Sequence, residues 1–127
     1  MRVLVTGGRH YADRVFLFKI LDKIHARRPI TLIIEGGASG ADSLAKSWAK
    51  LHRVESSTYP ADWDRYDNHA GRVRNCQMLR ESRPDLVVAF QGNKGTRHMV
   101  DIAEAAHVKT IKTWTLTSRR TSPPASP

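Results

Sequence analysis

Three short glycine-rich segments are the part of this sequence best suited to holding an anion. Each follows a run of β-branched and apolar residues and precedes a helical pattern, so each is expected to join a strand to the N-terminus of a helix. Amides at a helix N-terminus attract anions, and glycine lets a phosphate approach the backbone closely. The segments are Gly7-Gly8-Arg9, Glu35-Gly36-Gly37-Ala38-Ser39-Gly40-Ala41-Asp42 and Gly92-Asn93-Lys94-Gly95-Thr96.

Two readings of these glycines stay open at this point. They either form a ligand site together or serve only as tight turns between strand and helix. None of the segments is a complete G-x-G-x-x-G, and no G-x-x-x-x-G-K-[ST] occurs. A standard dinucleotide-binding domain and a P-loop NTPase are therefore disfavoured.

Two arginines are the best candidates for direct contact with an anion. Arg74 falls near the start of a helical stretch, and its guanidinium fork suits phosphate or carboxylate. Arg9 follows the first glycine pair and could reach the same anion. The alternative for both is an ordinary solvent-exposed arginine.

Polar side chains within the glycine segments offer further contacts. Glu35 and Asp42 flank the second segment, where a carboxylate could bind a ribose hydroxyl. Asp42 could instead complement the dipole in the first turn of its helix. Ser39 and Thr96 could cap helices or donate to a phosphate. Farther along, Trp63 either stacks on a base or covers the edge of the core.

The remaining chemistry-bearing residues suggest neither a metal site nor a redox site. None of the six histidines has a metal-binding partner at a recognised spacing, and we expect no metal and no cofactor. Cys76 is the one cysteine, which excludes an internal disulfide and is typical of a cytoplasmic protein. We expect it to be a buried, inert thiol.

The elements that must position these residues alternate between strand and helix. Continuous apolar strands, each followed by a helix, indicate an α/β fold with a doubly wound, five-stranded parallel sheet and helices on both faces. We expect a Rossmann-like strand order of 3-2-1-4-5, which brings the three glycine segments together where the winding reverses. Strands are expected over 2–6, 31–35, 54–59, 85–90 and 109–114; helices over 13–26, 39–52, 69–82 and 97–107; and a loop over 60–68.

Length and charge limit the remaining possibilities. The 127 residues fit one domain, expected over 1–116, followed by a Pro- and Ser-rich disordered tail over 117–127. No apolar run is long enough for a membrane span, so no membrane partner is expected. The formal charge of +9, from 21 Lys+Arg against 12 Asp+Glu, favours an anionic partner, either a small molecule or a polymer.

Several motifs in order along the chain resemble those of one known family. The chain is similar to the YspA-like, cpYpsA-related branch of the SLOG superfamily, which includes the Smf/DprA and LOG proteins. The resemblance covers roughly residues 1–114. It is carried by Thr6-Gly7-Gly8-Arg9, Glu35-Gly36-Gly37-Ala38-Ser39-Gly40-Ala41-Asp42, Pro60-Ala61-Asp62-Trp63, Arg74-Asn75-Met78-Leu79 and Pro84-Asp85-Leu86-Val87-Val88-Ala89-Phe90.

This resemblance implies a Rossmann-like fold and a pocket for a small, phosphorylated, nucleotide-like ligand. It places Arg74 and Asn75 in a family signature. The last glycine segment departs from the superfamily's usual Pro-Gly-Gly-x-Gly-Thr, with Gln91 in place of Pro and Asn93 in place of Gly. Asn tolerates left-handed backbone angles better than most residues, which would preserve the turn.

The LOG-type catalytic Glu is not matched. LOG phosphoribohydrolases place an acid two positions after the Thr, where this chain has His98; its first acid is Asp101. We therefore assign no catalytic residue. If the protein is an enzyme, the chemistry implied is N-glycosidic or other nucleotide hydrolysis.

Two classes of function follow from the sequence. The first is a nucleotide-binding protein, acting as a sensor or as a nucleotide-processing enzyme on a ribosyl or phosphoribosyl group. The alternative is a DprA-like nucleic-acid-binding module, in which the positive charge follows a phosphate backbone. Superfamily members often dimerise, so the resemblance also implies a homo-oligomer, which is compatible with either function.

Overall fold

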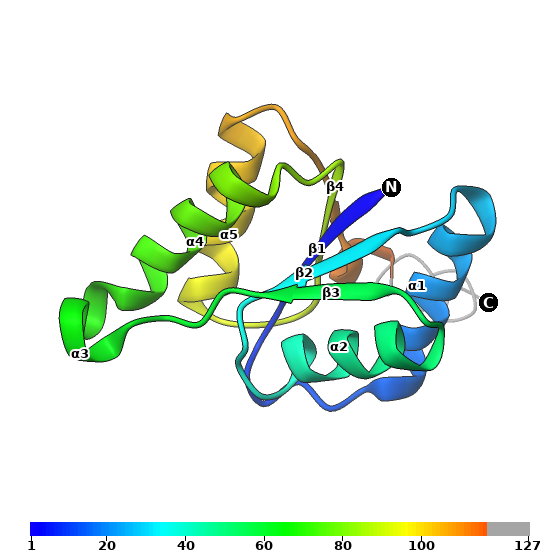
Figure 1. The fold of residues 1–127 in the computed structure, drawn as a ribbon, viewed down its shortest axis with the longest axis horizontal. Coiled ribbons are helices and arrows are strands. Elements are labelled where there is room, and N and C mark those ends of the chain that lie inside the picture. The colour runs from blue at the N-terminus through cyan, green and yellow to red at the C-terminus, as the bar shows by residue number, and fades with distance from the viewer. Residues whose placement is uncertain (117–127) are drawn as a thin grey trace, which may run out of the picture.

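All strands of the central sheet run in the same direction, in the order β3-β2-β1-β4-β5. This confirms the doubly wound α/β fold expected from the sequence. The computed structural model describes residues 1–116 (Figure 1), and the expected tail over 117–127 lies outside the described residues. The strands are β1 (Arg2–Thr6), β2 (Leu32–Glu35), β3 (Glu55–Thr58), β4 (Leu86–Ala89) and β5 (Lys109–Lys112).

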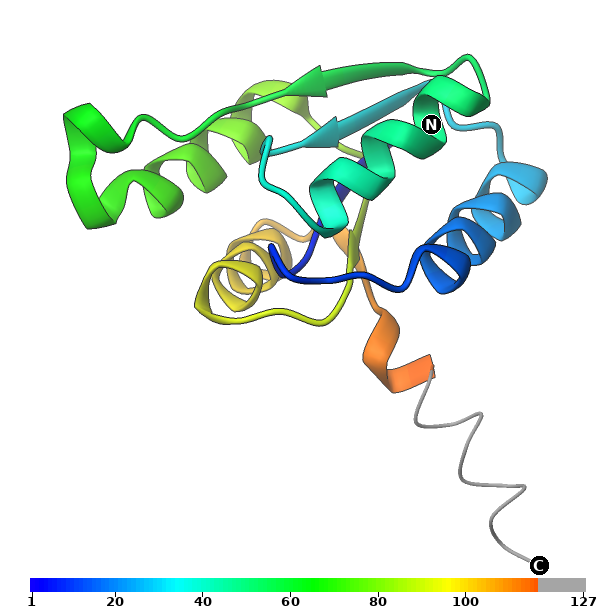
Figure 2. The same cartoon turned by 90° about the horizontal axis from the view of Figure 1, so that it is seen from below.

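Helices cover both faces of the sheet. Figures 1 and 2 show α1 and α2 on one side and α4 and α5 on the other. The helices are α1 (Arg14–Arg27), α2 (Ala41–Leu51), α3 (Trp63–Tyr66), α4 (Ala70–Ser82) and α5 (Lys94–Ala105), with a 3-10 turn, η1 (Asp67–His69), between α3 and α4. None of the described helices is both long enough and apolar enough to cross a membrane.

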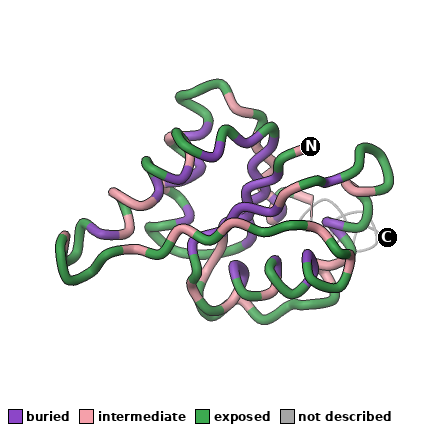
Figure 3. Tube along the Cα trace, in the orientation of Figure 1, coloured by how far each residue is buried: buried purple, intermediate pink, exposed green. Residues whose placement is uncertain are grey.

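Successive residues of the inner strands point into two separate cores. In β1, Val3 and Val5 pack with α1 and α2, whereas Leu4 packs with α4 and α5. β4 alternates in the same way, because Val88 belongs to the first core and Val87 to the second. Both faces of these strands are buried, which explains why their sequences are continuously apolar. Figure 3 shows this burial concentrated along the sheet.

Three local expectations were wrong. The segment 60–68 contains a helical turn, α3, because the Asp62 carboxylate caps it by accepting the Arg65 backbone N–H at 3.2 Å. Helix α5 begins at Lys94 rather than at 97. Its first turn is formed by the glycine segment itself, which has no apolar pattern from which a helix could be predicted. β5 ends at Lys112, and residues 113–116 are helical.

The exposure of two side chains corrects one expectation and decides one open alternative. Cys76 is exposed rather than buried. Trp63 is 59 % exposed, so it does not cover the edge of the core. Both residues lie on the α3–α4 side of the molecule.

Candidate functional site

The first and third glycine segments touch through their backbones at the carboxyl edge of the sheet. The Gly8 N–H donates to the Gln91 carbonyl at 3.0 Å. A Cβ on Gly92 would lie 2.6 Å from the Gly8 nitrogen, so only glycine allows this approach. The loops after β1 and β4 therefore close together at the point where the winding of the sheet reverses.

The second segment packs against the other side of the first. The Ala41 N–H donates to the Gly8 carbonyl at 3.2 Å, and the Ser39 hydroxyl donates to the Arg9 carbonyl at 2.9 Å. Gly40 has a φ of +77°, and a Cβ there would lie 2.6 Å from the Arg9 carbonyl oxygen. The three segments thus converge, and contacts between the loops explain why Gly40 and Gly92 are glycines. By contrast, a Cβ on Gly95 would meet no atom within 4 Å.

Arg74 and Asn75, on α4, join the second segment to the third by a chain of hydrogen bonds. Arg74 Nη1 donates to the Gly36 carbonyl at 2.7 Å, and its Nε donates to Asn75 Oδ1 at 3.0 Å. Asn75 Nδ2 then donates to the Gly95 carbonyl at 3.1 Å. Asn75 is only 3 % exposed. Both side chains therefore position the glycine segments, and direct contact between either of them and a ligand stays a prediction.

The two carboxylates of the second segment turn inward. Glu35, 1 % exposed, accepts the Gly37 N–H at 2.6 Å and the Thr58 hydroxyl. Asp42 Oδ2 accepts the N–H groups of Gly36 and Ala38, each at 3.2 Å. Both carboxylates already accept hydrogen bonds from groups of their own chain. Whether either of them also contacts a ribose stays a prediction.

Burial is the main cause of the pKa shifts in the cluster formed by Glu35, Asp42 and Arg74. It raises the pKa of Asp42 to about 6; the Glu35 carboxylate adds to the rise, while the backbone N–H groups and the Arg74 guanidinium oppose it. Burial also lowers the pKa of Arg74, and the carboxylates of Asp42 and Glu35 counteract this shift. In addition to making its hydrogen bonds, Arg74 therefore compensates the charge of these two inward carboxylates.

The N-termini of α2 and α5 differ in what surrounds them. Asp42 lies in the first turn of α2, so that helix end already carries a carboxylate. The first turn of α5 has no acidic residue, and its N-cap, Asn93, makes no side-chain capping bond. Lys94 and Gly95, in that turn, are exposed. The partial positive charge at the start of α5 is thus available to an external anion.

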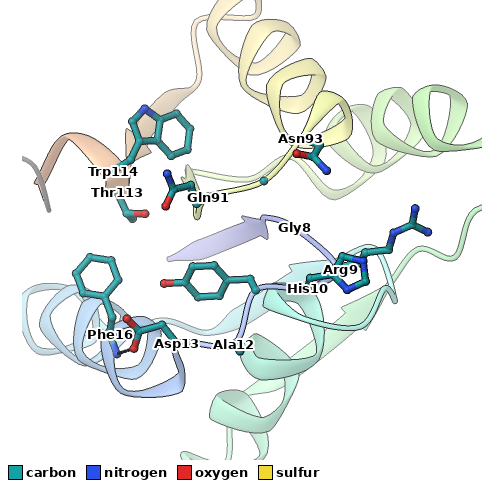
Figure 4. Close-up of a pocket in the computed structure, with 12 residues that line it drawn as sticks. Gly8, Arg9, His10, Ala12, Asp13, Phe16, Gln91, Asn93, Thr113 and Trp114 are labelled. Carbon is teal, nitrogen blue, oxygen red and sulfur yellow. Dashed lines mark hydrogen bonds between the residues drawn. The ribbon is translucent and has the colours of Figure 1, made fainter.

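A pocket of about 650 Å³ opens beside this helix end. Figure 4 shows Phe16, Gln91, Thr113 and Trp114 around its interior, with Arg9 at the end away from Phe16. The lining residues are Gly8, Arg9, His10, Tyr11, Ala12, Asp13, Phe16, Gln91, Gly92, Asn93, Thr113 and Trp114. Of the residues expected to bind ligand, Gly8, Arg9, Gly92 and Asn93 line it; Glu35, Asp42 and Arg74 do not.

Aromatic rings form the apolar part of the pocket. Tyr11 packs against Phe90 with ring centroids 5.4 Å apart, and Phe16 meets the same ring edge-on at 6.2 Å. Burial, together with Asp13, raises the pKa of Tyr11 to about 12, so its hydroxyl stays protonated. The sequence interpretation missed Tyr11, Phe16 and Trp114. The position of Trp114, just after the carboxyl end of the last strand, was the available signal.

No group of three or more His, Cys, Asp or Glu side chains within residues 1–116 is placed to hold a metal ion. The arrangement therefore offers backbone amides, exposed cations and rings. Groups of this kind suit a phosphate joined to a planar, partly apolar body.

Comparisons with known proteins agree with the resemblance seen in the motifs. The family model of the YspA, cpYpsA-related SLOG family matches residues 1–66. The match spans β1 to α3 and so includes the first two glycine segments. A relative, the "Gene 61 protein" of Mycobacterium phage D29, is 35 % identical over 118 residues, covering 87 % of this chain and 94 % of the relative.

Proposed function

Because the chain belongs to the YspA, cpYpsA-related SLOG family, we propose that it binds a nucleotide or nucleotide-derived ligand at the carboxyl edge of its sheet. The observation that carries the proposal is the aromatic pocket beside an uncapped helix N-terminus. Gly92 and Asn93 belong to both features, since they line the pocket and directly precede α5.

In the proposed complex, the phosphate lies at the first turn of α5. The exposed amides and the Lys94 ammonium face it there, and such a helix end contributes about 0.3–1 kcal/mol to anion binding. Arg9 lies at the same end of the pocket and supplies a second cation. The base lies among Tyr11, Phe16 and Trp114, where ring contacts and burial favour it.

We propose binding, as in a sensor, rather than bond cleavage. Asp13 is the one carboxylate among the described residues that line the pocket, and its Oδ1 accepts the Phe16 N–H at 3.0 Å as the cap of α1. General acid–base hydrolysis of a nucleotide requires a carboxyl or imidazole group free to exchange a proton with the substrate. Asp13 is committed to its capping role. The other proton-exchanging group in the lining is the exposed His10, and no carboxylate within residues 1–116 forms an ion pair with it that would orient its imidazole for catalysis.

A thermal-shift panel tests this proposal. The probes are nucleoside mono-, di- and triphosphates of the common bases, with inorganic phosphate and ribose 5-phosphate as fragments. At least one nucleotide should raise the melting temperature by several degrees, because a ligand at about 100 times its Kd adds about 2.7 kcal/mol.

Three single-residue variants test whether the ligand binds in the aromatic pocket and at the start of α5. Trp114→Leu should weaken nucleotide binding and leave the phosphate response unchanged, while Lys94→Ala should weaken both. Lys109→Ala, which removes the same charge from the opposite edge of the sheet, is the matched control. The proposal fails if no nucleotide stabilises the wild type, or if Lys109→Ala weakens binding as much as Lys94→Ala does.

A further inference from the structure

A second concave surface lies on the opposite side of the glycine segments from the aromatic pocket. It is a groove of about 1170 Å³ formed by the segment after β3, by α3 and α4, and by His98 of α5. In Figures 1 and 2, α3 lies at the outer end of α4, away from the sheet. We propose that this α3–α4 groove binds single-stranded nucleic acid.

Three exposed arginines line the groove: Arg65, Arg72 and Arg80. Within residues 1–116, none of them forms an ion pair with an Asp or Glu. The acids that line the groove have other partners, since Asp62 caps α3 and Glu81 accepts the Gln77 amide at 3.5 Å. Three arginines against two acids leave the groove with a net positive charge, and none of the three is held in an ion pair, which favours an anionic occupant.

The spacing of the arginines favours a polymer over a mononucleotide. Arg72 and Arg80 are eight residues apart on α4, which separates them by about 12 Å along the helix axis. Arginines spaced over two turns of a helix suit successive phosphates better than a single one. A ligand that engages the whole groove must carry several phosphates in a row, as a nucleic acid does.

Aromatic side chains at the same surface favour a single strand over a duplex. Tyr59 and Tyr66 line the groove, and the Arg65 guanidinium lies 5.2 Å from the centroid of the Tyr66 ring. Trp63, 59 % exposed, lies one turn before Tyr66 on α3. Unpaired bases stack on such rings, whereas the bases of a duplex are already stacked on one another.

Fluorescence anisotropy with a labelled oligothymidine of about 20 nucleotides tests the proposal. For the wild type, the logarithm of the binding constant should fall linearly with the logarithm of the salt concentration. Arg72→Ala/Arg80→Ala should lower the affinity about tenfold or more and make the salt slope shallower by about 1.4, since each lost phosphate contact on a single strand removes about 0.7. Tyr66→Leu should lower the affinity about fivefold or more without changing the slope.

Arg27→Ala/Arg28→Ala is the matched control, because it removes two exposed charges at the end of α1. It should leave the affinity within about twofold and the slope unchanged. The melting temperature of each variant, measured without ligand, checks that it is folded. Arg72→Ala/Arg80→Ala should also keep its thermal response to nucleotides, so that this proposal and the proposed function fail or succeed separately.

Four outcomes would overturn the proposal. The first is no binding by the wild type at low salt, and the second is an equal loss in the control. The third is equal affinity for a duplex of the same length. The fourth is displacement of the oligonucleotide by poly-glutamate as efficient as by unlabelled oligonucleotide, which would assign the groove to an acidic protein instead.

Discussion

The side-chain amide of Asn75 donates a hydrogen bond of 3.1 Å to the carbonyl of Gly95, in the first turn of α5. Asn75 itself accepts a bond from Arg74, which also holds the Gly36 carbonyl. Helix α4 thus fixes two glycine segments at once. The aromatic pocket depends on this link, because the segment that opens α5 also forms one wall of the pocket.

Asn75→Asp tests this link with almost no change in volume. The replacement puts a carboxylate oxygen where the amide donor faces the Gly95 carbonyl, so a hydrogen bond becomes a repulsion in a buried place. We expect a loss of about 2 kcal/mol or more in the free energy of unfolding. Urea denaturation measures it, and Asn68→Asp at an exposed position in η1 is the control. Equal stability of Asn75→Asp and wild type would contradict a role for the amide donor.

Arg74→Lys separates hydrogen-bonding geometry from charge. A lysine keeps the positive charge near Asp42 and Glu35 but cannot reproduce the fork that holds Gly36 and Asn75 together. We expect Arg74→Lys to cost about 1–2 kcal/mol, and Arg74→Met to cost more, because two buried carboxylates would lose their compensating cation. Urea denaturation ranks the two variants. Equal losses in the free energy of unfolding would show that Arg74 acts through the hydrogen-bonding geometry of its guanidinium alone and not through its charge.

The order of the strands could be predicted from the sequence because each inner strand is apolar on both faces. Alternation of such strands with helices, joined by right-handed crossovers, leaves few arrangements, and the observed order is one of them. The start of α5 could not be predicted in the same way. Its first turn is Lys94-Gly95-Thr96, which has no apolar residue to mark a helical period.

The candidate site was predictable only in part. The convergence of the glycine segments followed from the parallel sheet, and the backbone contacts of Gly8 confirm it. The direction of a side chain depends on packing that one sequence does not specify. Glu35 and Asp42 bind backbone amides of their own loop, and Arg74 holds a carbonyl there. Trp114 reaches the pocket from the short helical segment after β5, which carries no motif.

Gly40→Ala and Gly95→Ala should have opposite effects on stability. Gly40 has a positive φ and its missing Cβ faces the Arg9 carbonyl, so alanine there should cost about 2 kcal/mol or more. Gly95 lies in a helix with open space around it, so alanine there should gain up to about 0.5–1 kcal/mol. Thermal unfolding of both variants measures this contrast. Two equal losses would contradict the idea that contact between the loops, rather than helix geometry, requires Gly40.

The Asp42 carboxyl should make the stability of the protein depend on pH. Its pKa is raised from 3.8 to about 6, so the folded chain holds this proton more tightly than the unfolded chain does. The stabilisation that results is complete below about pH 4 and is lost as the pH rises through about 6. The difference between the two pKa values corresponds to about 3 kcal/mol.

Asp42→Asn isolates this effect, because the amide oxygen can still accept the N–H groups of Gly36 and Ala38. Relative to wild type, the variant should gain about 2–3 kcal/mol between pH 4 and pH 7, since it carries no buried charge at the higher pH. Urea denaturation at a series of pH values measures the gain. Asp64→Asn, at an exposed position in α3, is the matched control for replacing a carboxylate by an amide. If Asp42→Asn kept a constant difference from wild type at every pH, the carboxyl would titrate alike in the folded and unfolded chain, and burial would not govern this cluster.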